Sequence, residues 1–447
     1  MKTESSAQTK ISARETALKA LYKIEQEESF AEDTVEKLAG ENRLSPPDRR
    51  LVAELVLGTT KMRKRIDFEI GFLLDQRIER LTPWIRNILR MGIYQFEFTD
   101  RIPEYAAVNE AVNLARKYGH GGVARLVNAV LRNYQRKKKE IRFPEDETDY
   151  LATFYSIPEW LIEKWLAIFD MENVVRLCHY FNQKPAVGVR INTLKSDAAE
   201  IEGYCKEREI TIRKGIYAGD FYYLQSAVEL EKVELIEQGK VYLQDEASLL
   251  SVGLLYPKAG ETVLDLCAAP GGKSTYLAQK MENHGKIIAV DKSVAKIAMM
   301  KKNCQRLGVS MVETVLGDAT DFKAEKVDKV LVDAPCSGTG VLHRNADARW
   351  RKNPQDLKRL PELQLKILEN AISLVRQGGV IVYSTCSIMP EENQEVVERI
   401  LSKHRELELE DAGKVLCSAV VTKEGYLRTL PFLHNIDGAF GARLVKK

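Results

Sequence analysis

The chain has 447 residues, of which 45% are apolar and 29% charged, as is usual for a folded globular protein of two or three domains. No apolar run approaches the roughly 20 residues that span a bilayer, which excludes a membrane-spanning class. The start, Met1–Ser6, is polar and gives no sign of a signal peptide. The seven cysteines are odd in number and include no Cys-x-x-Cys pair, which argues against a disulfide framework and a zinc site and favours a reducing, cytoplasmic location.

The net charge of +3 is unevenly distributed along the chain. Residues 1–143 hold 27 Lys and Arg against 20 Asp and Glu, a net of +7, and the remaining 304 residues hold 40 against 44, a net of −4. The first part contains two basic clusters, Lys61–Arg65 and Arg132–Arg142. Clusters of this kind suit the phosphate backbone of a nucleic acid, although solvated helix faces carry similar runs.

Residues 1–140 are predicted to form an all-helical bundle. Apolar residues recur every three or four positions, and helix-start signals precede them: a capping box of Ser12 and Glu15, and Pro83 at a first helical position. The glycines within 119–122 break the pattern before it resumes. This stretch resembles the NusB-like RNA-binding fold, and it therefore implies an N-terminal domain that contacts RNA. The resemblance rests on Ile102-Pro103, Val108–Val112 and Leu126–Arg132.

A charged stretch at 137–150 that contains Pro144 is predicted to link this domain to the rest. Residues 150–240 mix helical and strand-like patterns, which indicates a small α+β subdomain. From 241 to 447, short apolar strands alternate with helices, which is typical of a doubly wound parallel sheet and predicts a Rossmann-like α/β domain. The strands are expected at 262–266, 286–290, 313–316, 327–332 and 379–383, and the helices at 273–280, 294–307 and 361–374.

The first of these strands runs into a glycine turn and then a helix, as in nucleotide-binding folds. The spacing is neither Gly-x-Gly-x-x-Gly nor that of a P-loop, which disfavours nicotinamide cofactors and ATP. Asp291 and Asp318 follow the second and third strands, where they can accept from ribose hydroxyls and an adenine amino group, although each alone could cap a helix. A ligand with a ribose, an adenine and a carboxylate but no phosphate is S-adenosylmethionine. The residues expected to border it are Cys267, Ala268, Ala269, Pro270, Gly271, Gly272, Lys273, Asp291, Asp318 and Asp333.

Two cysteines stand at the carboxyl ends of predicted strands. Cys336 lies in the run Asp333-Ala334-Pro335-Cys336, and Cys386 lies in Ser384-Thr385-Cys386-Ser387. Open parallel sheets place their chemistry at these strand ends, so each thiol is a candidate nucleophile and Asp333 a candidate proton donor. Two thiols at one pocket suggest a covalent mechanism in which one attaches and the other helps release. The alternative interpretation is a pair of small buried core residues.

These runs are similar to those of the RNA cytosine-5 methyltransferases. The resemblance rests on Cys267–Ser274, Asp333–Gly338 and Ser384–Ser387, the last followed by Pro390–Asn393. With the NusB-like domain, the chain is identified as a member of the bacterial RsmB family, also called Sun or Fmu. The resemblance covers nearly the whole chain and implies methylation of a cytosine in 16S ribosomal RNA with S-adenosylmethionine as the donor. Gln244–Ser248 and Arg190–Thr193 match the family as well.

The resemblance also implies a role for each catalytic group. Addition of a thiolate to carbon 6 of cytosine activates carbon 5, which then accepts the methyl group, loses its proton and allows the thiolate to be eliminated. By match, Cys386 is the nucleophile and Cys336 the residue that assists release. Asp333 is expected beside N3 and the exocyclic amine, with Lys273 near that acid. The target base must be single-stranded, looped or flipped to be reached.

Two segments on the expected RNA side depart from the family's pattern. His343–Asp347 replaces Arg-Arg-His-Pro-Asp, and Asp437–Phe440 replaces Asp-Gly-Phe-Phe, which affects the choice of substrate more than the reaction. The alternatives are a cytosine-5 methyltransferase acting on transfer RNA and a non-catalytic RNA-binding assembly factor. An amino-directed N-methyltransferase would need an Asn/Asp-Pro-Pro-Tyr motif, where this chain has Asp-Ala-Pro-Cys. The six histidines show no metal-ligand spacing, so we expect no metal, no membrane and a monomer.

Overall fold

The computed structural model describes residues 11–100, 102–224 and 234–447. The polar segment Met1–Ser6, on which the expectation of no signal peptide rests, lies outside them. The chain forms two compact units, a helical unit of Met1–Gln183 with Leu342–Lys352 and a sheet unit of Lys184–Val341 with Asn353–Lys447. Within the described ranges, no helix combines the length and apolar character needed to cross a membrane.

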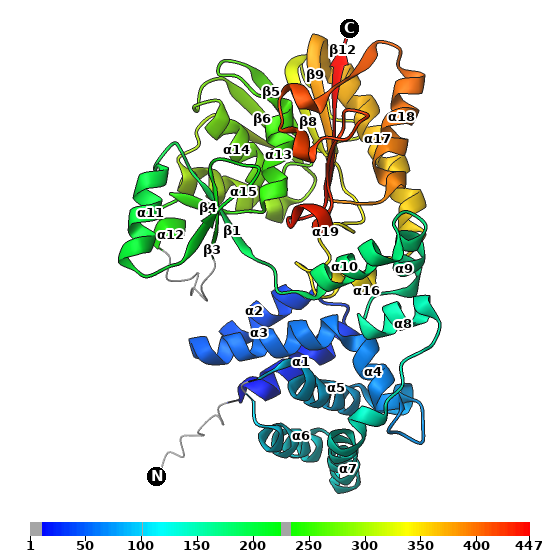
Figure 1. The fold of residues 1–447 in the computed structure, drawn as a ribbon. Coiled ribbons are helices and arrows are strands. Elements are labelled where there is room, and N and C mark those ends of the chain that lie inside the picture. The colour runs from blue at the N-terminus through cyan, green and yellow to red at the C-terminus, as the bar shows by residue number, and fades with distance from the viewer. Residues whose placement is uncertain (1–10, 101, 225–233) are drawn as a thin grey trace. The chain divides into compact units, whose positions relative to one another are not determined.

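In the helical unit, the helices between residues 13 and 137 pack around one apolar core, which confirms the predicted NusB-like bundle (Figure 1). Fully buried side chains such as Leu18, Leu55, Ile88 and Leu131 come from four different helices. Its helices are α1 (Ala13–Gln26), α2 (Ala31–Glu41), α3 (Pro46–Lys61), α4 (Arg63–Gly71), α5 (Pro83–Phe98), α6 (Glu104–Tyr118), α7 (Gly121–Lys137), α8 (Glu147–Phe154), α9 (Glu159–Leu166), α10 (Met171–Asn182) and α16 (Ala348–Arg351).

Of the predicted capping box at the start of α1, the serine forms its expected hydrogen bond and the glutamate does not. The hydroxyl of Ser12 accepts a hydrogen bond from the backbone N–H of Glu15 (3.1 Å) and so caps α1. The Glu15 carboxylate, however, turns to α6, where it accepts from Lys117 Nζ (2.8 Å) and the hydroxyl of Tyr118 (2.7 Å). Only half of the expected capping box forms, because this long-range ion pair takes the second partner.

The segment Leu342–Lys352 belongs to the helical unit by its contacts, although its chain neighbours belong to the sheet unit. The fully buried Arg349 donates to the carbonyls of Ser156 (3.0 Å) and Phe181 (2.9 Å) and to Oδ1 of Asn182 (3.0 Å). The indole N–H of Trp350 donates to the carbonyl of Thr60 (2.7 Å). These bonds fix the segment on α3 and the α8–α10 region.

The two basic clusters have different surroundings. In the first, Lys61 donates to the carbonyl of His343 (3.4 Å), Arg63 lies over the ring of Trp350 (4.7 Å) and Arg65 pairs with Glu69 (2.9 Å). In the second, Arg136, Lys137 and Lys139 are exposed at the end of α7 and beyond it. The first cluster is therefore used in internal contacts, and the second is the one that faces solvent.

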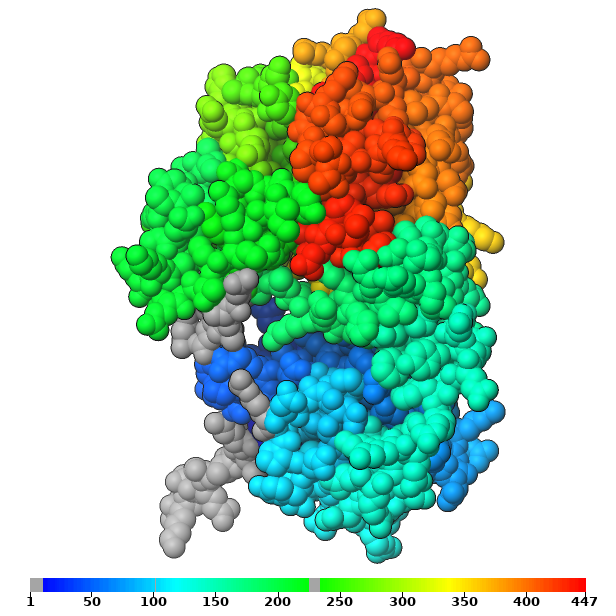
Figure 2. Space-filling view, in the orientation of Figure 1, coloured from blue at the N-terminus to red at the C-terminus, as the bar shows by residue number. Residues whose placement is uncertain are grey.

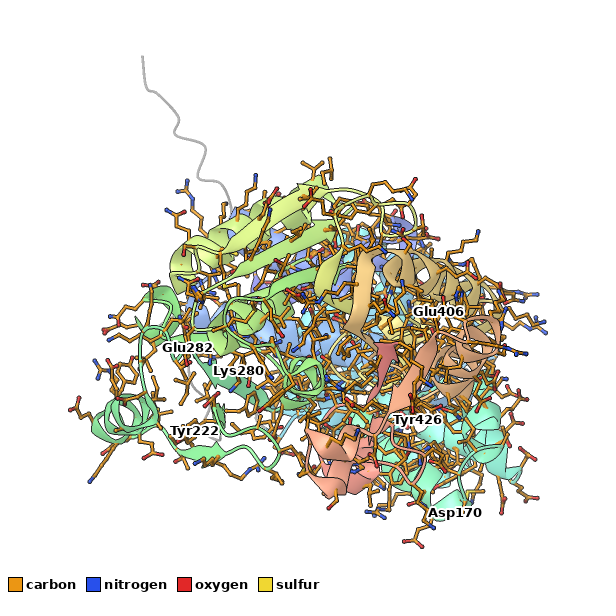
Figure 3. The ribbon with its side chains drawn as sticks, turned by 90° about the horizontal axis from the view of Figure 1, so that it is seen from above. Asp170, Tyr222, Lys280, Glu282, Glu406 and Tyr426 are labelled. Atoms are coloured by element: carbon orange, nitrogen blue, oxygen red, sulfur yellow. The ribbon has the colours of Figure 1, made fainter. Side chains whose placement is uncertain are left out.

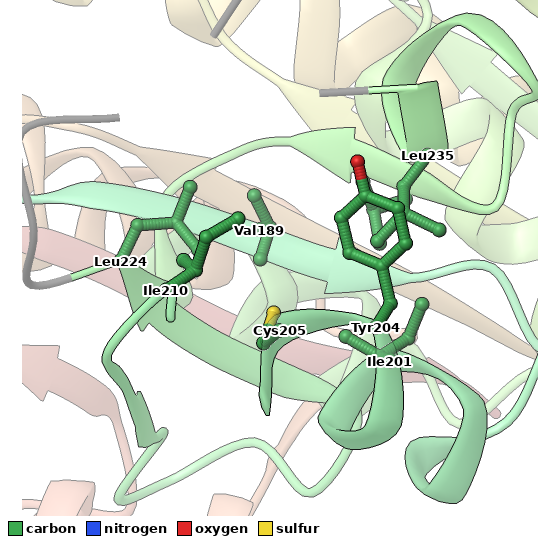
Figure 4. Close-up of a pocket in the computed structure, with 8 residues that line it drawn as sticks. Val189, Ile201, Tyr204, Cys205, Ile210, Leu224 and Leu235 are labelled. Carbon is green, nitrogen blue, oxygen red and sulfur yellow. The ribbon is translucent and has the colours of Figure 1, made fainter. Parts of the chain in front are cut away.

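The sheet unit begins with a four-stranded antiparallel sheet in the order β2-β3-β1-β4. Helix α11 packs on it through Ile201 and Cys205, which matches the predicted α+β subdomain. An apolar pocket lies between this helix and the strands; Figure 4 shows its lining, which includes Val189 and Leu235. The elements are β1 (Val187–Ile191), α11 (Ala198–Glu207), β2 (Ile212–Lys214), β3 (Phe221–Leu224), α12 (Glu234–Glu237) and β4 (Val241–Leu243).

The second sheet has the strand order β10-β12-β9-β8-β5-β6-β7, with β11 paired to β12 (Figure 1). The strands from β9 to β7 in this order are parallel, as predicted, and β10, β11 and β12 add antiparallel pairs. The sheet is thus mixed rather than wholly parallel. Its strands are β5 (Thr262–Leu266), β6 (Lys286–Asp291), β7 (Val312–Leu316), β8 (Val327–Asp333), β9 (Val375–Thr385), β10 (Leu407–Glu410), β11 (Leu427–Thr429) and β12 (Ala439–Lys446).

Helices cover both faces of this sheet, which confirms the Rossmann-like prediction. One face packs on α13 (Glu246–Leu255), α14 (Gly272–Lys280) and α15 (Val294–Leu307), and the other on α17 (Asp356–Leu374) and α18 (Gln394–Lys403). Helix α17 begins five residues before the expected start, and Pro361 lies inside it.

The last strand of the sheet unit, β12, is bonded to the end of helix α13 of the same unit. Arg443 of β12 donates to the carbonyls of Leu254 (2.8 Å) and Leu255 (3.0 Å) at the end of α13. In the space-filling view, the red C-terminal residues accordingly lie beside green residues of the same unit (Figure 2). The two sheets are also joined, since Lys280 of α14 pairs with Asp220 (2.6 Å), two residues before Tyr222 of β3 (Figure 3).

Candidate active site

The carboxyl ends of the parallel strands lie at one edge of the sheet and carry the residues predicted from the sequence. Asp291 ends β6, and Asp333 ends β8. Cys386 directly follows β9. Because neighbouring parallel strands end together, residues from distant parts of the chain meet here.

The loop after β5 turns sharply before α14 begins at Gly272. Cys267 and Gly271 have positive φ angles of 64° and 97°. A Cβ atom on Gly271 would lie 2.6 Å from Cγ of Met300, so glycine is required here for both backbone conformation and space. The loop is fixed to β6 because the N–H of Ala268 donates to the carbonyl of Val290 (2.9 Å).

The two candidate cofactor acids are held by backbone N–H groups. The carboxylate of Asp291 accepts from the N–H of Ala269 (3.2 Å) through one oxygen and from the N–H of Ser293 (2.9 Å) through the other. Asp318 accepts from the N–H of Thr320 (2.9 Å) and from its hydroxyl (2.8 Å), and these bonds lower the pKa of Asp318. Each carboxylate keeps lone pairs for a ligand, since an ionised carboxylate offers about four acceptor positions.

Lys273 and Asp333 form an ion pair between α14 and the end of β8. Lys273 Nζ lies 2.7 Å from Oδ2 of Asp333, and the hydroxyl of Ser384 donates to Oδ1 (3.2 Å). Burial lowers the pKa of Lys273, but the Asp333 carboxylate outweighs it, and the Cys386 sulfur acts in the same direction, so the net shift is upward. Lys273 is therefore a cation at the point where the two cysteine loops meet.

The two candidate catalytic cysteines are in contact. Their Sγ atoms lie 3.3 Å apart, and both side chains are partly exposed. Hydrogen bonding to Cys386 raises the pKa of the Cys336 thiol well above its ordinary value, and burial and the charge of Glu392 add to the effect. The Cys336 thiolate is therefore disfavoured while the Cys386 sulfur beside it is unreacted. Burial likewise raises the pKa of Cys267, in the glycine loop, to about 12.

The structure also contains site residues to which the sequence patterns gave no role. Glu392, in the run Pro390–Asn393, is fully buried and bonds to the residues that follow both cysteines. Gly340 donates to the carbonyl of Cys386 (2.9 Å) and accepts from the N–H of Gly438 (2.9 Å). A Cβ atom on Gly340 would lie 2.4 Å from the carbonyl oxygen of Gly438. A sequence signal existed only for Glu392, as part of a matched motif.

The segments that depart from the family's pattern lie in different units. His343 is buried in the helical unit, where its ring contacts those of Tyr180 (4.8 Å) and Phe181 (5.9 Å). Phe440 is buried in the sheet unit and contacts Tyr383 (6.3 Å) and Tyr426 (5.2 Å). Both aromatic groups serve packing in their own units.

The residues at the strand ends fit S-adenosylmethionine. The close-packed loop at 267–272 brings backbone and a helix start to the site, and Asp291 and Asp318 offer oriented acceptors for hydroxyl and amino groups. Beside them stand two thiols and an ion pair, which can attack, hold or protonate a base. A Rossmann-like sheet with these groups at its carboxyl edge defines an S-adenosylmethionine-dependent methyltransferase.

Comparisons with known proteins show to which family of methyltransferases the chain belongs. The family model described as 16S rRNA methyltransferase RsmB/F matches residues 252–445, that of the NusB family matches 11–136, and that of the RsmF/B-like ferredoxin-like domain matches 157–231. The probable ribosomal RNA small subunit methyltransferase B of Bacillus subtilis is 36% identical over 446 residues, covering 98% of this chain and 99% of its own. Its counterpart in Synechocystis sp. is 34% identical over 451 residues, covering 98% and 100%. The chain belongs to the family of ribosomal RNA small subunit methyltransferase B, and it is an RNA methyltransferase.

A solved structure agrees with the whole fold. The crystal structure of PH0851 matches with a TM-score of 0.81 and 27% sequence identity, and the match covers 96% of this chain and 98% of that one. The helical bundle, the small antiparallel sheet and the large mixed sheet are therefore common to both proteins.

Proposed function

We propose that this protein transfers a methyl group from S-adenosylmethionine to carbon 5 of a cytosine in 16S ribosomal RNA through a covalent cysteine intermediate. The observation that carries the proposal is the contact of the Cys336 and Cys386 sulfurs, 3.3 Å apart, beside the Lys273–Asp333 ion pair. A base-modifying enzyme needs a nucleophile, a proton donor and a second group for release at one point. The names of the relatives, with their ribosomal substrate, support the choice of RNA.

The proposed mechanism uses each of these side chains at a stated atom. The Cys386 thiol passes its proton to Asp333 and its sulfur bonds to carbon 6 of the cytosine, while the electron pair of the 5,6 double bond moves to carbon 5. Asp333 stabilises this change by hydrogen bonding at N3 and the exocyclic amine, and Lys273 holds that acid in place. S-adenosylmethionine, when bound, supplies the methyl group in electrophilic form. Once Cys386 is bonded to carbon 6, Cys336 loses its proton to water and, as a thiolate, takes the proton from carbon 5. The electron pair of that C–H bond restores the 5,6 double bond, and the bond between the Cys386 sulfur and carbon 6 breaks with Cys386 leaving as a thiolate.

We also propose which residues border the cofactor, how the chain divides into domains and where the enzyme acts. The cofactor is bordered by residues 267–273, with Asp291 at the ribose, Asp318 at the adenine and Asp333 near the reacting end. The division into a NusB-like domain at 1–140, an α+β subdomain at 150–240 and a catalytic domain at 241–447 is part of it. We further propose that the enzyme acts as a monomer in the cytoplasm without a bound metal.

The two cysteines are expected to fail differently when changed to alanine. Cys386→Ala should abolish methylation and form no RNA adduct, because nothing attacks carbon 6. Cys336→Ala should still attack and methylate but release slowly, so a denaturation-resistant protein–RNA complex should accumulate. Denaturing gels of both variants with RNA and S-adenosylmethionine test this. An adduct with Cys386→Ala and none with Cys336→Ala would reverse the roles, and full turnover in both would remove the covalent mechanism.

The substrate is tested separately from the mechanism. Methyl transfer to deproteinised 16S ribosomal RNA should exceed transfer to transfer RNA, and bisulfite mapping should place the product at a cytosine. Preference for transfer RNA would support the first alternative. An absence of transfer to either RNA by the wild-type protein, with RNA binding retained, would favour a non-catalytic assembly factor.

A further inference from the structure

A buried carboxylate without a charged partner among its hydrogen bonds lies behind the two cysteines. Glu392 follows β9 in a short helical turn, and its side chain is fully buried. Its Oε1 accepts from the N–H of Ser337 (2.7 Å) and from Nε2 of Gln364 (3.3 Å). Its Oε2 accepts from the hydroxyls of Ser387 (2.6 Å) and Ser337. A buried carboxylate is costly unless such donors satisfy it, so this arrangement needs a reason.

Two of the donor residues, Ser337 and Ser387, belong to the loops that carry the cysteines, and the third, Gln364, lies on α17. Ser337 directly follows Cys336, and Ser387 directly follows Cys386. Gln364 also donates to the carbonyl of Pro335 (3.0 Å), the residue before Cys336. One carboxylate is therefore bonded, directly or through Gln364, to both neighbours of one cysteine and to the next residue of the other.

The backbone alone does not hold these loops together over their whole length. The parallel pairing of β8 with β9 ends at Asp333 and Ser384, two to three residues before the cysteines. Beyond it, the N–H of Ala334 donates to the carbonyl of Ser384 (2.9 Å), and the N–H of Gly340 to that of Cys386 (2.9 Å). Between these two backbone bonds, the Glu392 carboxylate cross-links the loops. The hydroxyl of Thr339 adds direct bonds to the hydroxyl of Ser387 (3.0 Å) and the N–H of Ile388 (3.2 Å).

The residue that carries this carboxylate is held from the sheet side. The hydroxyl of Tyr383, buried in β9, donates to the backbone carbonyl of Glu392 (2.5 Å) and lies 3.0 Å from Oε1 of Gln364. Glu392 and Gln364, which both bond to the cysteine loops, thus contact the same buried tyrosine. A group fixed in this way can set a distance, because neither end of the link is free to move.

We propose that Glu392 is a positioning residue for methyl transfer, whose carboxylate holds the Cys336 and Cys386 loops at the separation that lets both sulfurs serve one base. The proposal rests on the proposed covalent function of the two cysteines. Glu392 does not touch the base; it acts through Ser337 and Ser387. Its reach, rather than its charge, is the property that matters.

The test compares two variants that separate reach from charge. Glu392→Asp keeps the charge but shortens the side chain by one carbon, so it cannot bond both loops. Glu392→Gln keeps the length; its amide oxygen can accept from Ser337 N–H and Gln364, and the two serine hydroxyls can turn to accept from its N–H groups. Glu398→Gln, an exposed position on α18, is the matched control.

The first readout measures the sulfur separation without catalysis. Diamide takes two electrons and two protons from a pair of neighbouring thiols, and mass spectrometry then gives the yield of the peptide linked through Cys336 and Cys386. We expect a high yield in the wild type, in Glu392→Gln and in the control. In Glu392→Asp the yield should be lower by roughly threefold or more, because a disulfide bond forms only between sulfurs that can come into contact. S-adenosylmethionine affinity and thermal unfolding are measured on the same samples.

The second readout is the single-turnover rate of methyl transfer to RNA at saturating S-adenosylmethionine. Glu392→Asp should be slower by about 10–100-fold, the effect of a misplacement near 1 Å, and Glu392→Gln should recover most of the rate. Equal crosslinking and equal rates in Asp and wild type would overturn the proposal, as would a Gln variant that crosslinks normally but is as slow as Asp. A Cys336→Ala enzyme that methylates RNA without accumulating a denaturation-resistant adduct instead contradicts the covalent function, so the two failures are distinguishable.

Discussion

At the residue scale, the carboxylates of the sheet unit differ in how many hydrogen-bond and ion-pair partners stabilise their ionised form. Asp333 pairs with the Lys273 cation, and Glu392 accepts from four donor groups. Asp265, on β5, is fully buried and accepts only from the hydroxyl of Ser274 (2.6 Å), while its Oδ1 has no hydrogen-bond partner among the described residues. Burial raises the pKa of Asp265 to about 7. Asp265 is therefore the acid whose ionisation the fold supports least.

We predict that Asp265→Asn stabilises the sheet unit above pH 7. Because the folded pKa lies above the unfolded one, the folded state binds more protons between about pH 4 and 7, and stability falls as pH rises through this window. The amide has no charge to bury, so its free energy of unfolding should exceed that of the wild type by on the order of 2–4 kcal/mol at pH 8 and by much less at pH 5. Urea unfolding at both pH values measures the difference.

Asp321→Asn, at an exposed position of the same unit, is the control and should change stability little at either pH. A stability difference for Asp265→Asn that is the same at pH 5 and pH 8 would contradict the assignment of the cost to the buried charge.

At the scale of elements, apolar runs predicted the parallel strands of the large sheet well and its antiparallel strands not at all. Strands β5, β6, β7 and β8 lie within one residue of their expected bounds, because buried parallel strands read as short continuous apolar runs. The sequences of β10 and β12 contain charged residues such as Glu408 and Arg443, and they become strands only by pairing with each other and with β9. Helix α17 was predicted too short because Pro361 normally marks a helix start.

The candidate active site likewise has features that the sequence predicted and features that it did not. Strand-end motifs predicted the meeting of Lys273, Asp333, Cys336 and Cys386, because sheet topology alone brings these ends together. The bonds of Glu392 to Ser337 and Gln364 were not predictable, since hydrogen bonds across 55 and 28 residues of sequence leave no local pattern.

The segment around α16 supports a prediction at the element scale. Arg349 is fully buried, and its three hydrogen-bond acceptors are uncharged. We predict that Arg349→Ala loosens Leu342–Lys352 from the helical unit, because two carbonyls and one amide oxygen lose their donor and a cavity remains. The cost should be about 2–4 kcal/mol. Limited proteolysis within 342–352 and amide hydrogen exchange of α10 should both become faster.

Arg359→Ala, which removes an exposed arginine of α17, is the matched control and should leave both rates unchanged. If the segment in Arg349→Ala is cleaved no faster than in the wild type, Trp350 and its neighbours hold it without the buried guanidinium.

At the scale of the whole molecule, the excess of positive charge in the first part of the chain can serve RNA binding only where the basic side chains are exposed. The sequence offered two basic clusters of equal standing, but the structure uses Lys61, Arg63 and Arg65 for internal contacts. Burial even lowers the pKa of Lys61 to about 8. An RNA backbone needs cations that face solvent, and Arg136, Lys137 and Lys139 are exposed.

We therefore predict that the second cluster supplies a sequence-independent part of the RNA affinity. Replacing Lys137 and Lys139 by glutamate should weaken binding on the order of tenfold at low salt and reduce the slope of log affinity against log salt by about 1–2, because each lost phosphate contact releases fewer counterions. Filter binding or fluorescence anisotropy over a salt series measures both quantities. The control makes the same charge change at Lys258 and Lys326, which are exposed near the amino ends of β5 and β8, opposite the catalytic edge. If the two double variants lose affinity and slope equally, overall charge rather than this cluster governs RNA binding, and the role assigned to the end of α7 is wrong.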